Sequence, residues 1–135
     1  MKKLIISFVV LSVVAFIIVT AVMPNTPAAS KKLAAEIKTA SADGKNVFIQ
    51  LSSTGCVTCR KMKPELEKLM ADFANNQNIF IVNVDVDAHP SIATQFAVNA
   101  VPTQVLLSTG SEEIYRNTGY LSFDSMKSLL NEALN

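Results

Sequence analysis

The longest hydrophobic stretch of the chain lies close to its N-terminus. The run from Leu4 to Met23 contains no charged residue, glycine or proline. About 20 residues at about 1.5 Å each would span roughly 30 Å, the thickness of a bilayer's hydrocarbon core. This run is longer than the roughly 7–15 apolar residues of a cleaved signal peptide, so residues 1–23 predict an uncleaved membrane anchor. Val19-Thr20-Ala21 is also an acceptable cleavage site, which leaves secretion after cleavage as the alternative.

The rest of the chain is predicted to lie on the far side of the membrane. Lys2 and Lys3 precede the apolar run, and flanking positive residues stay in the cytoplasm, so the domain should face the periplasm or the outside of the cell. Residues 24–30 contain two prolines and predict a short extended linker. Residues 31–135 have about the size of one small globular domain.

From Ser30 onward the spacing of apolar residues alternates between helical and strand patterns. Four segments carry apolar residues at helical spacing, and four other segments are mostly apolar or alternating. The predicted helices are Ser30–Ala40 with Ser30 as N-cap, Cys56 to about Asn75, Pro90–Phe96 and Phe123–Leu134. The predicted strands are Asn46–Ser52, Ile79–Val86, Thr103–Leu107 and Glu112–Asn117, the last two as a hairpin. This order predicts an α/β fold with helices on both faces of a central mixed sheet.

Two of these helices also predict which side chains are buried. Pro64 lies within the helix that follows the cysteines and should kink it. The apolar residues expected on the inner faces are Met62, Leu66, Leu69, Met70 and Phe73 in that helix, and Met126, Leu129, Leu130 and Leu134 in the last one.

Composition limits the classes of partner. The formal net charge is only +1, which gives no electrostatic attraction to nucleic acid or to acidic substrates. The only two cysteines, Cys56 and Cys59, suit a single dithiol in an exported protein, and no third cysteine remains for cross-linking. We expect a monomer that does not bind nucleic acid.

The segment Cys56-Val57-Thr58-Cys59 is the strongest indication of function. A strand-like run precedes it and a helix-like run follows, so the two thiols stand one turn apart at a helix N-terminus, where the thiolate is favoured. An inert structural disulfide fits less well, because a two-residue loop constrains the unfolded chain very little. A zinc site needs about four ligands, and His89 is the only histidine. The pattern therefore predicts a redox-active disulfide with no metal or other cofactor.

The order of elements, the cysteine pair and four further motifs resemble the thioredoxin family. These motifs are Pro64 in the active-site helix, Val84-Asp85-Val86-Asp87 followed by Pro90, Val101-Pro102-Thr103 as the loop with a cis-proline facing the dithiol, and Gly119 before the last helix. The resemblance covers roughly Lys31 to the C-terminus. It implies a thioredoxin-like fold.

The resemblance also assigns roles around the dithiol. Cys56 should be the nucleophile that attacks a partner's disulfide, and Cys59 should be the thiol that resolves the mixed disulfide. Pro102 should be cis and pack on the dithiol, with the backbone of Val101 pairing with the substrate. A trans proline at the start of an edge strand is the alternative reading of Pro102.

The sequence departs from cytoplasmic thioredoxins at several of these positions. Gly55 stands where they carry tryptophan, and Val57-Thr58 stand where they carry Gly-Pro; we expect these residues to support the site and contact substrate. Gln50 and Asn83 stand where the family has a buried carboxylate and a lysine. An amide cannot take up a proton, so Cys59 would lose its proton to water. Gln50 and Asn83 either assist that transfer or are simply buried, hydrogen-bonded amides.

Three cations follow the first cysteine closely in the sequence. Arg60, Lys61 and Lys63 either lower the pKa of the Cys56 thiol through their positive charge or form a solvated helix face. The sequence favours neither interpretation over the other.

Within the family, STGCVTCRKMKPELEKL together with VPTQVLL and GYLS resembles exported, membrane-tethered bacterial thioredoxin-like proteins. The C-V-x-C form resembles the C-terminal domain of the transmembrane thiol:disulfide interchange reductases. This implies an extracytoplasmic oxidoreductase that reduces disulfides of exported proteins, such as cytochrome c maturation factors, with electrons from a membrane thiol donor. The alternatives are a tethered binding module with the same fold and a net oxidant that inserts disulfides.

Overall fold

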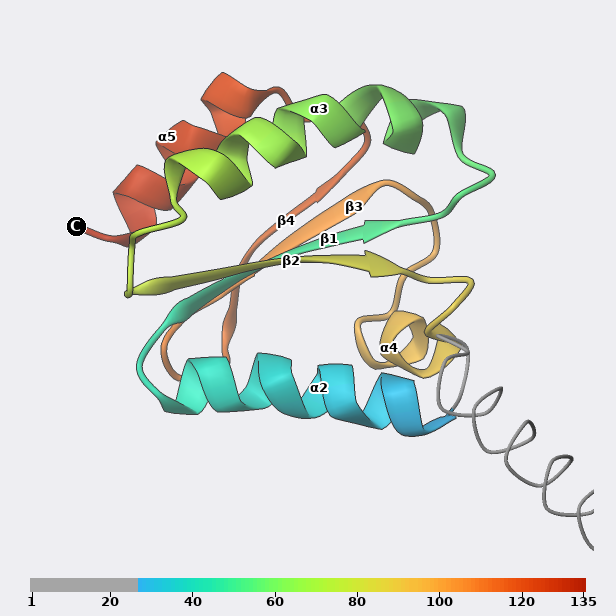
Figure 1. Cartoon of the computed structure of the whole chain (residues 1–135), viewed down its shortest axis with the longest axis horizontal. Coiled ribbons are helices and arrows are strands. Elements are labelled where there is room, and N and C mark those ends of the chain that lie inside the picture. Colours follow the sequence, from blue (N-terminus) through green and yellow to red (C-terminus); the bar gives the residue numbers. More distant parts are fainter. Residues whose placement is uncertain (1–26) are drawn as a thin grey trace, which may run out of the picture.

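The computed structural model describes residues 27–135, which form a sheet between two layers of helices (Figure 1). Helices α3 and α5 cover one face of the sheet, and α2 and α4 cover the other. The elements in chain order are α2 (Pro27–Ala42), β1 (Asn46–Ser52), α3 (Val57–Asp72), β2 (Ile79–Asp85), α4 (Pro90–Gln95), β3 (Thr103–Leu107), β4 (Glu113–Thr118) and α5 (Phe123–Ala133). The predicted α/β order is confirmed.

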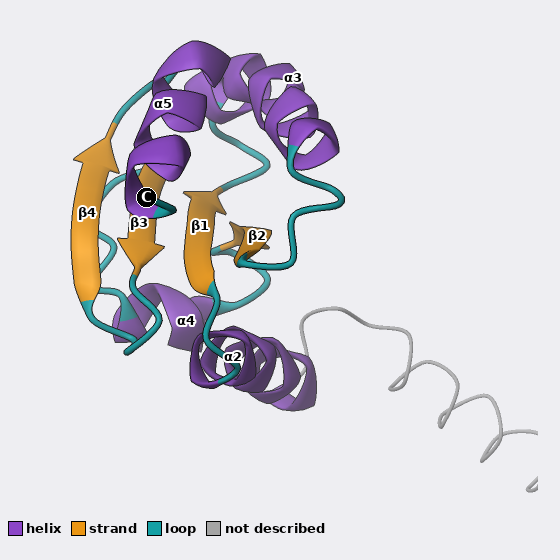
Figure 2. Ribbon diagram, turned by 90° about the vertical axis from the view of Figure 1, so that its left-hand side faces the viewer, coloured by secondary structure: helices purple, strands orange, loops and turns teal. Residues whose placement is uncertain are grey.

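The sheet is mixed, as expected, with the strand order β2-β1-β3-β4 (Figure 2). Strand β1 pairs in parallel with β2 and antiparallel with β3, and β3 pairs antiparallel with β4. The order places β1 in the interior of the sheet, and six of its seven residues are buried. A central strand covered on both faces needs a nearly continuous apolar sequence, which NVFIQLS provides except at its two ends and at Gln50.

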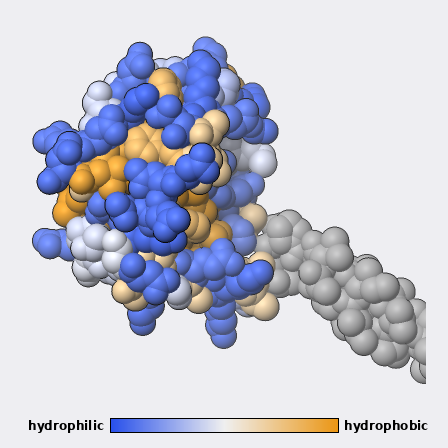
Figure 3. All heavy atoms as spheres, turned by 60° about the vertical axis from the view of Figure 1, so that its left-hand side comes forward, coloured by the Kyte–Doolittle hydropathy of each residue, from blue (hydrophilic) through white to orange (hydrophobic). Residues whose placement is uncertain are grey.

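Side chains of β1 alternate between two hydrophobic clusters. Val47, Ile49 and Leu51 pack with residues of α2 and α4, whereas Phe48 packs with residues of α3 and α5. On the surface, apolar side chains are interrupted by hydrophilic ones on the face shown in Figure 3. The cluster that contains Phe48 fixes α3 on the sheet and thereby fixes the position of the cysteines at its start.

The start of α2 differs from the prediction. The helix begins at Pro27, so residues 27–30 are helical and do not belong to an extended linker. Proline is favoured in the first turn, where its missing N–H has no helical partner to lose. Ser30 is no N-cap: it is buried inside the helix, and its hydroxyl lies 3.0 Å from Nδ1 of His89 at the start of α4.

The predicted anchor at residues 1–23 and the linker residues 24–26 lie outside the described residues. From residue 27 to residue 135, no helix combines the length and apolar character that a membrane crossing requires.

The predicted inner face of α3 is correct except at one position. Met62, Leu66 and Leu69 are buried and Phe73 closes the helix as a buried C-cap, but Met70 is 42% exposed. The four buried residues follow the i, i+4, i+7, i+11 spacing of one helix face, and Met70 lies one position beyond that stripe. Met126 and Leu130 of α5 are buried as expected, with Leu129 and Leu134 packed at the edge of the same cluster.

Candidate active site

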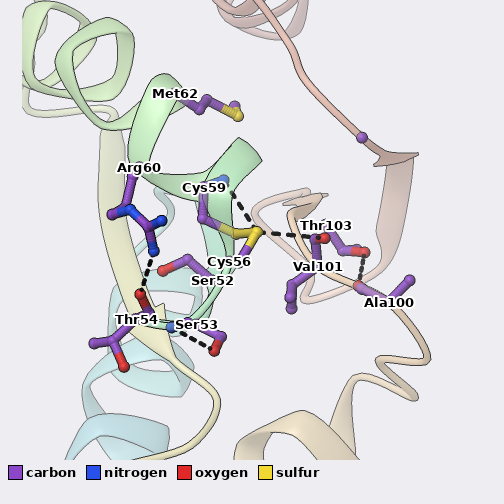
Figure 4. Close-up of a disulfide and its surroundings, with 12 residues drawn as sticks. Ser52, Ser53, Thr54, Cys56, Cys59, Arg60, Met62, Ala100, Val101 and Thr103 are labelled. Atoms are coloured by element: carbon purple, nitrogen blue, oxygen red, sulfur yellow. Dashed lines mark hydrogen bonds between the residues drawn. A yellow bond between two sulfur atoms is a disulfide. The ribbon is translucent and has the colours of Figure 1, made fainter.

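Cys56 and Cys59 form a disulfide at the N-terminus of α3 (Figure 4). Strand β1 ends at Ser52, a short loop follows, and Cys56 is the N-cap residue, with an extended backbone. Its sulfur accepts a hydrogen bond from the backbone N–H of Cys59 at 3.0 Å. The same donor and the positive end of the helix dipole would stabilise a thiolate at Cys56 after reduction.

The two sulfurs differ in their access to solvent. Cys56 is half-buried, whereas Cys59 is only 7% exposed. A partner's disulfide therefore reaches Cys56 more readily than Cys59. This arrangement is consistent with the predicted division into an attacking and a resolving thiol.

The loop before β3 faces the first cysteine. The peptide bond between Val101 and Pro102 is cis, in agreement with the sequence analysis. The carbonyl oxygen of Val101 lies 3.7 Å from the sulfur of Cys56 (Figure 4). The loop is tied down on both sides, because Thr103 Oγ1 donates to the carbonyl of Ala100 at 2.7 Å and the N–H of Gly119 donates to the carbonyl of Pro102 at 2.8 Å.

The three residues at the departures from cytoplasmic thioredoxins are all exposed beside the disulfide. Gly55 and Thr58 are at the surface, and Val57 is 58% exposed. Gly55 leaves the position before Cys56 open, because a Cβ there would come no closer than 3.8 Å to another side chain. Val57 thus offers an apolar contact next to the accessible sulfur.

The cations after Cys56 do not form one cluster. Arg60 Nη1 donates to the carbonyl of Thr54 at 2.9 Å and so braces the loop that leads to the disulfide (Figure 4). Lys63 pairs with Glu67 on the helix surface at 3.8 Å, with both side chains more than 60% exposed. Lys61 is exposed. Lys61 and Lys63 therefore match the solvated helix face, and Arg60 is a loop contact.

Gln50 and Asn83 occupy different environments, although they were expected to be alike. Gln50 is 3% exposed on β1, as a buried amide should be. Asn83 is exposed, so its assignment as a buried polar residue is wrong. The reason is its place on β2, an edge strand of the sheet. The side chain of Asn83 accepts a hydrogen bond from Ser52 Oγ at 2.8 Å.

The structure also shows two buried or half-buried amides that the sequence analysis missed. Gln104 of β3 is fully buried opposite Gln50, and Asn117 of β4 lies opposite Gln104. Gln104 Nε2 donates to Gln50 Oε1 at 3.1 Å, and Asn117 Nδ2 donates to Gln104 Oε1 at 2.6 Å. We call Gln50, Gln104 and Asn117 the amide row. The only sequence signal for it was a single glutamine in each of two mostly apolar strands, β1 and β3, which pair in the sheet.

A cleft of about 340 Å³ lies next to the second cysteine, between α3 and the ends of β1 and β2. Its lining includes Gln50, Ser52, Cys59, Asn83 and Asp85. The volume is enough for several water molecules, each of which takes about 30 Å³ in the liquid. Cys59, although buried from the outer surface, can therefore exchange a proton with water in the cleft.

No metal site accompanies the cysteines in the described part of the chain. Between residues 27 and 135, no three or more His, Cys, Asp or Glu side chains are grouped so that they could hold a metal ion. His89 caps α4 and contacts Ser30, in the loop position expected for it.

A comparison with protein families decides what this geometry represents. The sequence model described as thioredoxin matches residues 26–132, which is most of the chain. The chain belongs to the thioredoxin family. Its Cys56–Cys59 pair is accordingly the redox pair of a thioredoxin-like disulfide oxidoreductase.

Individual relatives agree with this assignment. The thioredoxin of Chlamydia caviae is 33% identical over 86 residues, which is 64% of this chain and 80% of that protein. The protein disulfide isomerase-like 2-2 of Oryza sativa is 30% identical over 87 residues, and this chain spans only 24% of its length. Among solved structures, the thioredoxin NaTrxh from Nicotiana alata superposes with a TM-score of 0.66 at 23% identity, covering 76% of this chain and 85% of that one. The last comparison shows a shared fold.

Proposed function

We propose that this thioredoxin-family chain reduces disulfides of exported proteins from the extracytoplasmic face of a membrane, to which residues 1–23 anchor it. The observation that carries the proposal is the placement of Cys56: its sulfur is the accessible one, it caps α3, and it lies beside the Val101 carbonyl. A partner disulfide can approach the sulfur there while its backbone reaches Val101.

The reaction follows from the two sulfur environments. The Cys56 thiolate attacks one sulfur of the partner's disulfide, forms a mixed disulfide and releases the other partner sulfur as a thiolate. Cys59 then loses its proton and attacks the sulfur of Cys56, which releases the second partner thiolate and leaves the Cys56–Cys59 disulfide. Two electrons pass from this chain to the partner, and a membrane thiol donor restores the dithiol.

Two features support the finer parts of the proposal. The apolar run at residues 4–23 with Lys2 and Lys3 before it is typical of an anchor that leaves its domain outside the cytoplasm. The exposed Val57 offers an apolar contact to a protein partner beside the reactive sulfur. The partners proposed are exported dithiol proteins, including cytochrome c maturation factors.

The experiment is to trap the mixed disulfide in cells. A Cys59→Ser variant keeps the attacking thiol but cannot resolve the adduct, so we expect it to accumulate covalent complexes with a few exported proteins. Non-reducing electrophoresis and mass spectrometry identify them. The control is the double variant with Cys56→Ser and Cys59→Ser, in which every adduct should vanish.

Other outcomes favour the rival functions. If the doubly substituted chain retains its partners as well as the native chain does, the protein is a binding module and the proposal is wrong. A reduction potential well above that of its partners would instead make the chain a net oxidant, since about 30 mV in a two-electron couple corresponds to roughly 1.4 kcal/mol.

A further inference from the structure

The donors and acceptors of the amide row can be arranged in only one way, because a backbone carbonyl lies at one end of the row. The carbonyl oxygen of Gly119 accepts from Gln104 Nε2 at 3.3 Å and from Asn117 Nδ2 at 3.4 Å. A carbonyl can only accept, so the atoms next to it must be the amide nitrogens of the two side chains. The oxygen of Gln104 is then the atom that meets Asn117, at 2.6 Å.

The orientation of Gln104 also fixes the orientation of the Gln50 amide. Because Gln104 presents its nitrogen to Gln50, the atom of Gln50 that meets it must be the acceptor Oε1, at 3.1 Å. The sulfur of Met62, 3.5 Å from the same nitrogen, is a further weak acceptor and does not alter the order. A swap of nitrogen and oxygen in Gln50 would place two donors against each other.

This arrangement turns the amide nitrogen of Gln50 toward the cleft. Among the described residues, Gln50 Nε2 has no hydrogen-bond partner, yet no fully buried side-chain nitrogen or oxygen lacks one. This nitrogen must therefore reach open space, and the space that Gln50 lines is the cleft shared with Cys59. Where the family has a carboxylate, this chain presents an amide donor.

We propose that the amide row holds the N–H groups of Gln50 toward the cleft so that they stabilise the Cys59 thiolate, directly or through one water, when Cys59 resolves the mixed disulfide. The inference rests on the proposed function. In that step the Cys59 proton passes to cleft water, the Cys59 sulfur bonds to the Cys56 sulfur, and the partner sulfur leaves with the electron pair of the broken bond. Gln104 and Asn117 are positioning residues, because they act through Gln50.

The charged groups around the cleft do not replace this role. Arg60 and Lys63 of α3 and Asp85 of β2 line the cleft, while the lining residues of β1 and of the loop after it are uncharged. Arg60 is engaged with the carbonyl of Thr54, Lys63 with Glu67, and Asp85 accepts from the N–H of Asp87 at 3.0 Å. Unlike these charged side chains, Gln50 is a buried hydrogen-bond donor.

The test is a titration of Cys59 that needs no substrate. In a Cys56→Ser chain with 13C-labelled cysteine, the Cβ resonance of Cys59 reports its ionisation as the pH rises. Adding Gln50→Met removes the donor without adding charge, so we expect the pKa of Cys59 to rise by about one unit, the usual scale of a hydrogen bond to a charged group. Asn46→Ala is the matched control, because Asn46 is also a buried amide on the same strand, bonded to the carbonyl of Ala133, and should leave the titration unchanged.

A second variant keeps the test decisive if Gln50→Met does not fold. Replacing Gln50 and Gln104 together by methionine removes both partners of their hydrogen bond, which costs less than leaving one of them unpaired. The same rise of about one unit is expected. A titration of Cys59 that stays within about 0.2 unit of the parent in a folded variant overturns the inference. Because no turnover is measured, this result is independent of whether the chain reduces protein disulfides.

Discussion

One helical turn separates the two sulfurs, and that turn gives them different chemistry. Cys56 precedes the first helical residue, so its sulfur can accept an N–H from the helix end and remain accessible. Cys59 lies within the turn, is buried and lines the cleft. The proposed division of roles between the two cysteines thus rests on their positions relative to the helix N-terminus.

Gly119 also acts at the residue scale, through a backbone conformation that other residues rarely adopt. Its φ is +117°, and a Cβ at this position would meet nothing within 4 Å, so a side chain is excluded by the backbone and not by a clash. Its N–H and carbonyl tie the Pro102 loop to the amide row. The glycine therefore connects the loop that faces Cys56 with the residues behind Cys59.

We predict that Gly119→Ala lowers the free energy of unfolding by about 1–3 kcal/mol, the usual cost of a strained backbone conformation. Urea denaturation measures it. The control is Gly110→Ala in the β3–β4 turn, where φ is not in the left-handed region and the nearest contact of a Cβ is 3.8 Å. That change should stay within about 0.5 kcal/mol. Equal effects of the two substitutions would contradict the prediction.

At the scale of elements, the side chain of Arg116 links the edge strand β4 to the end of helix α4. Arg116 donates to both carboxylate oxygens of Glu113 at 2.7 Å and to the carbonyl of Phe96, the C-cap of α4, at 2.9 Å. The hydrogen bonds from Arg116 lower the pKa of Glu113, burial opposes this shift, and the charge of Arg116 adds to it. The pair links an edge strand to a short helix.

The lowered pKa of Glu113 predicts how the pair depends on pH. Because the carboxylate is favoured in the folded state, its contribution is complete above the ordinary pKa of 4.5 and disappears as the pH falls through the folded value. Both side chains are more than a third exposed, so solvent limits the contribution to less than about 1 kcal/mol.

The corresponding variant is Glu113→Gln, which should lower the free energy of unfolding at pH 7 by up to about 1 kcal/mol and have a smaller effect at pH 3. Denaturant unfolding at both pH values measures the difference. Glu112→Gln is the control, since among residues 27–135 Glu112 forms no ion pair. A loss for Glu113→Gln that is as large at pH 3 as at pH 7 would refute the prediction.

The elements themselves were predictable because their signals are local. The apolar run of β1, the helical stripe of α3 and the turn between β3 and β4 each depend on residues close in sequence. The first turn of α2 could not be predicted, because proline is typical both of linkers and of helix starts. The amide row was not found either, since Gln50, Gln104 and Asn117 become neighbours only through the pairing of three strands.

At the scale of the whole molecule, the groups around the disulfide gather at one end of the domain. Cys56, Val57 and the Val101 loop lie at the same end of the domain, where β1 ends and α3 begins. The cleft behind Cys59 opens near the same end, beside the last residue of β2. One end of the domain therefore carries the accessible sulfur, the Val101 carbonyl that we propose contacts a partner, and the cleft that we propose takes up the proton of Cys59.

The proposed anchor makes a prediction about where this end of the molecule lies in the cell. If residues 1–23 span the membrane with Lys2 and Lys3 in the cytoplasm, the reduced Cys56 lies outside that membrane. A membrane-impermeant maleimide should then label Cys56 in bacterial cells whose outer envelope is permeabilised while the cytoplasmic membrane stays closed. The labelled chain should remain at full length in carbonate-washed membranes. A Cys56→Ser chain should lose most of the label, because Cys59 is buried. A shorter labelled chain in the external fluid would indicate that the leader is cleaved after export. Labelling that occurs only after lysis would show that the domain lies in the cytoplasm, and the proposed location would then be wrong.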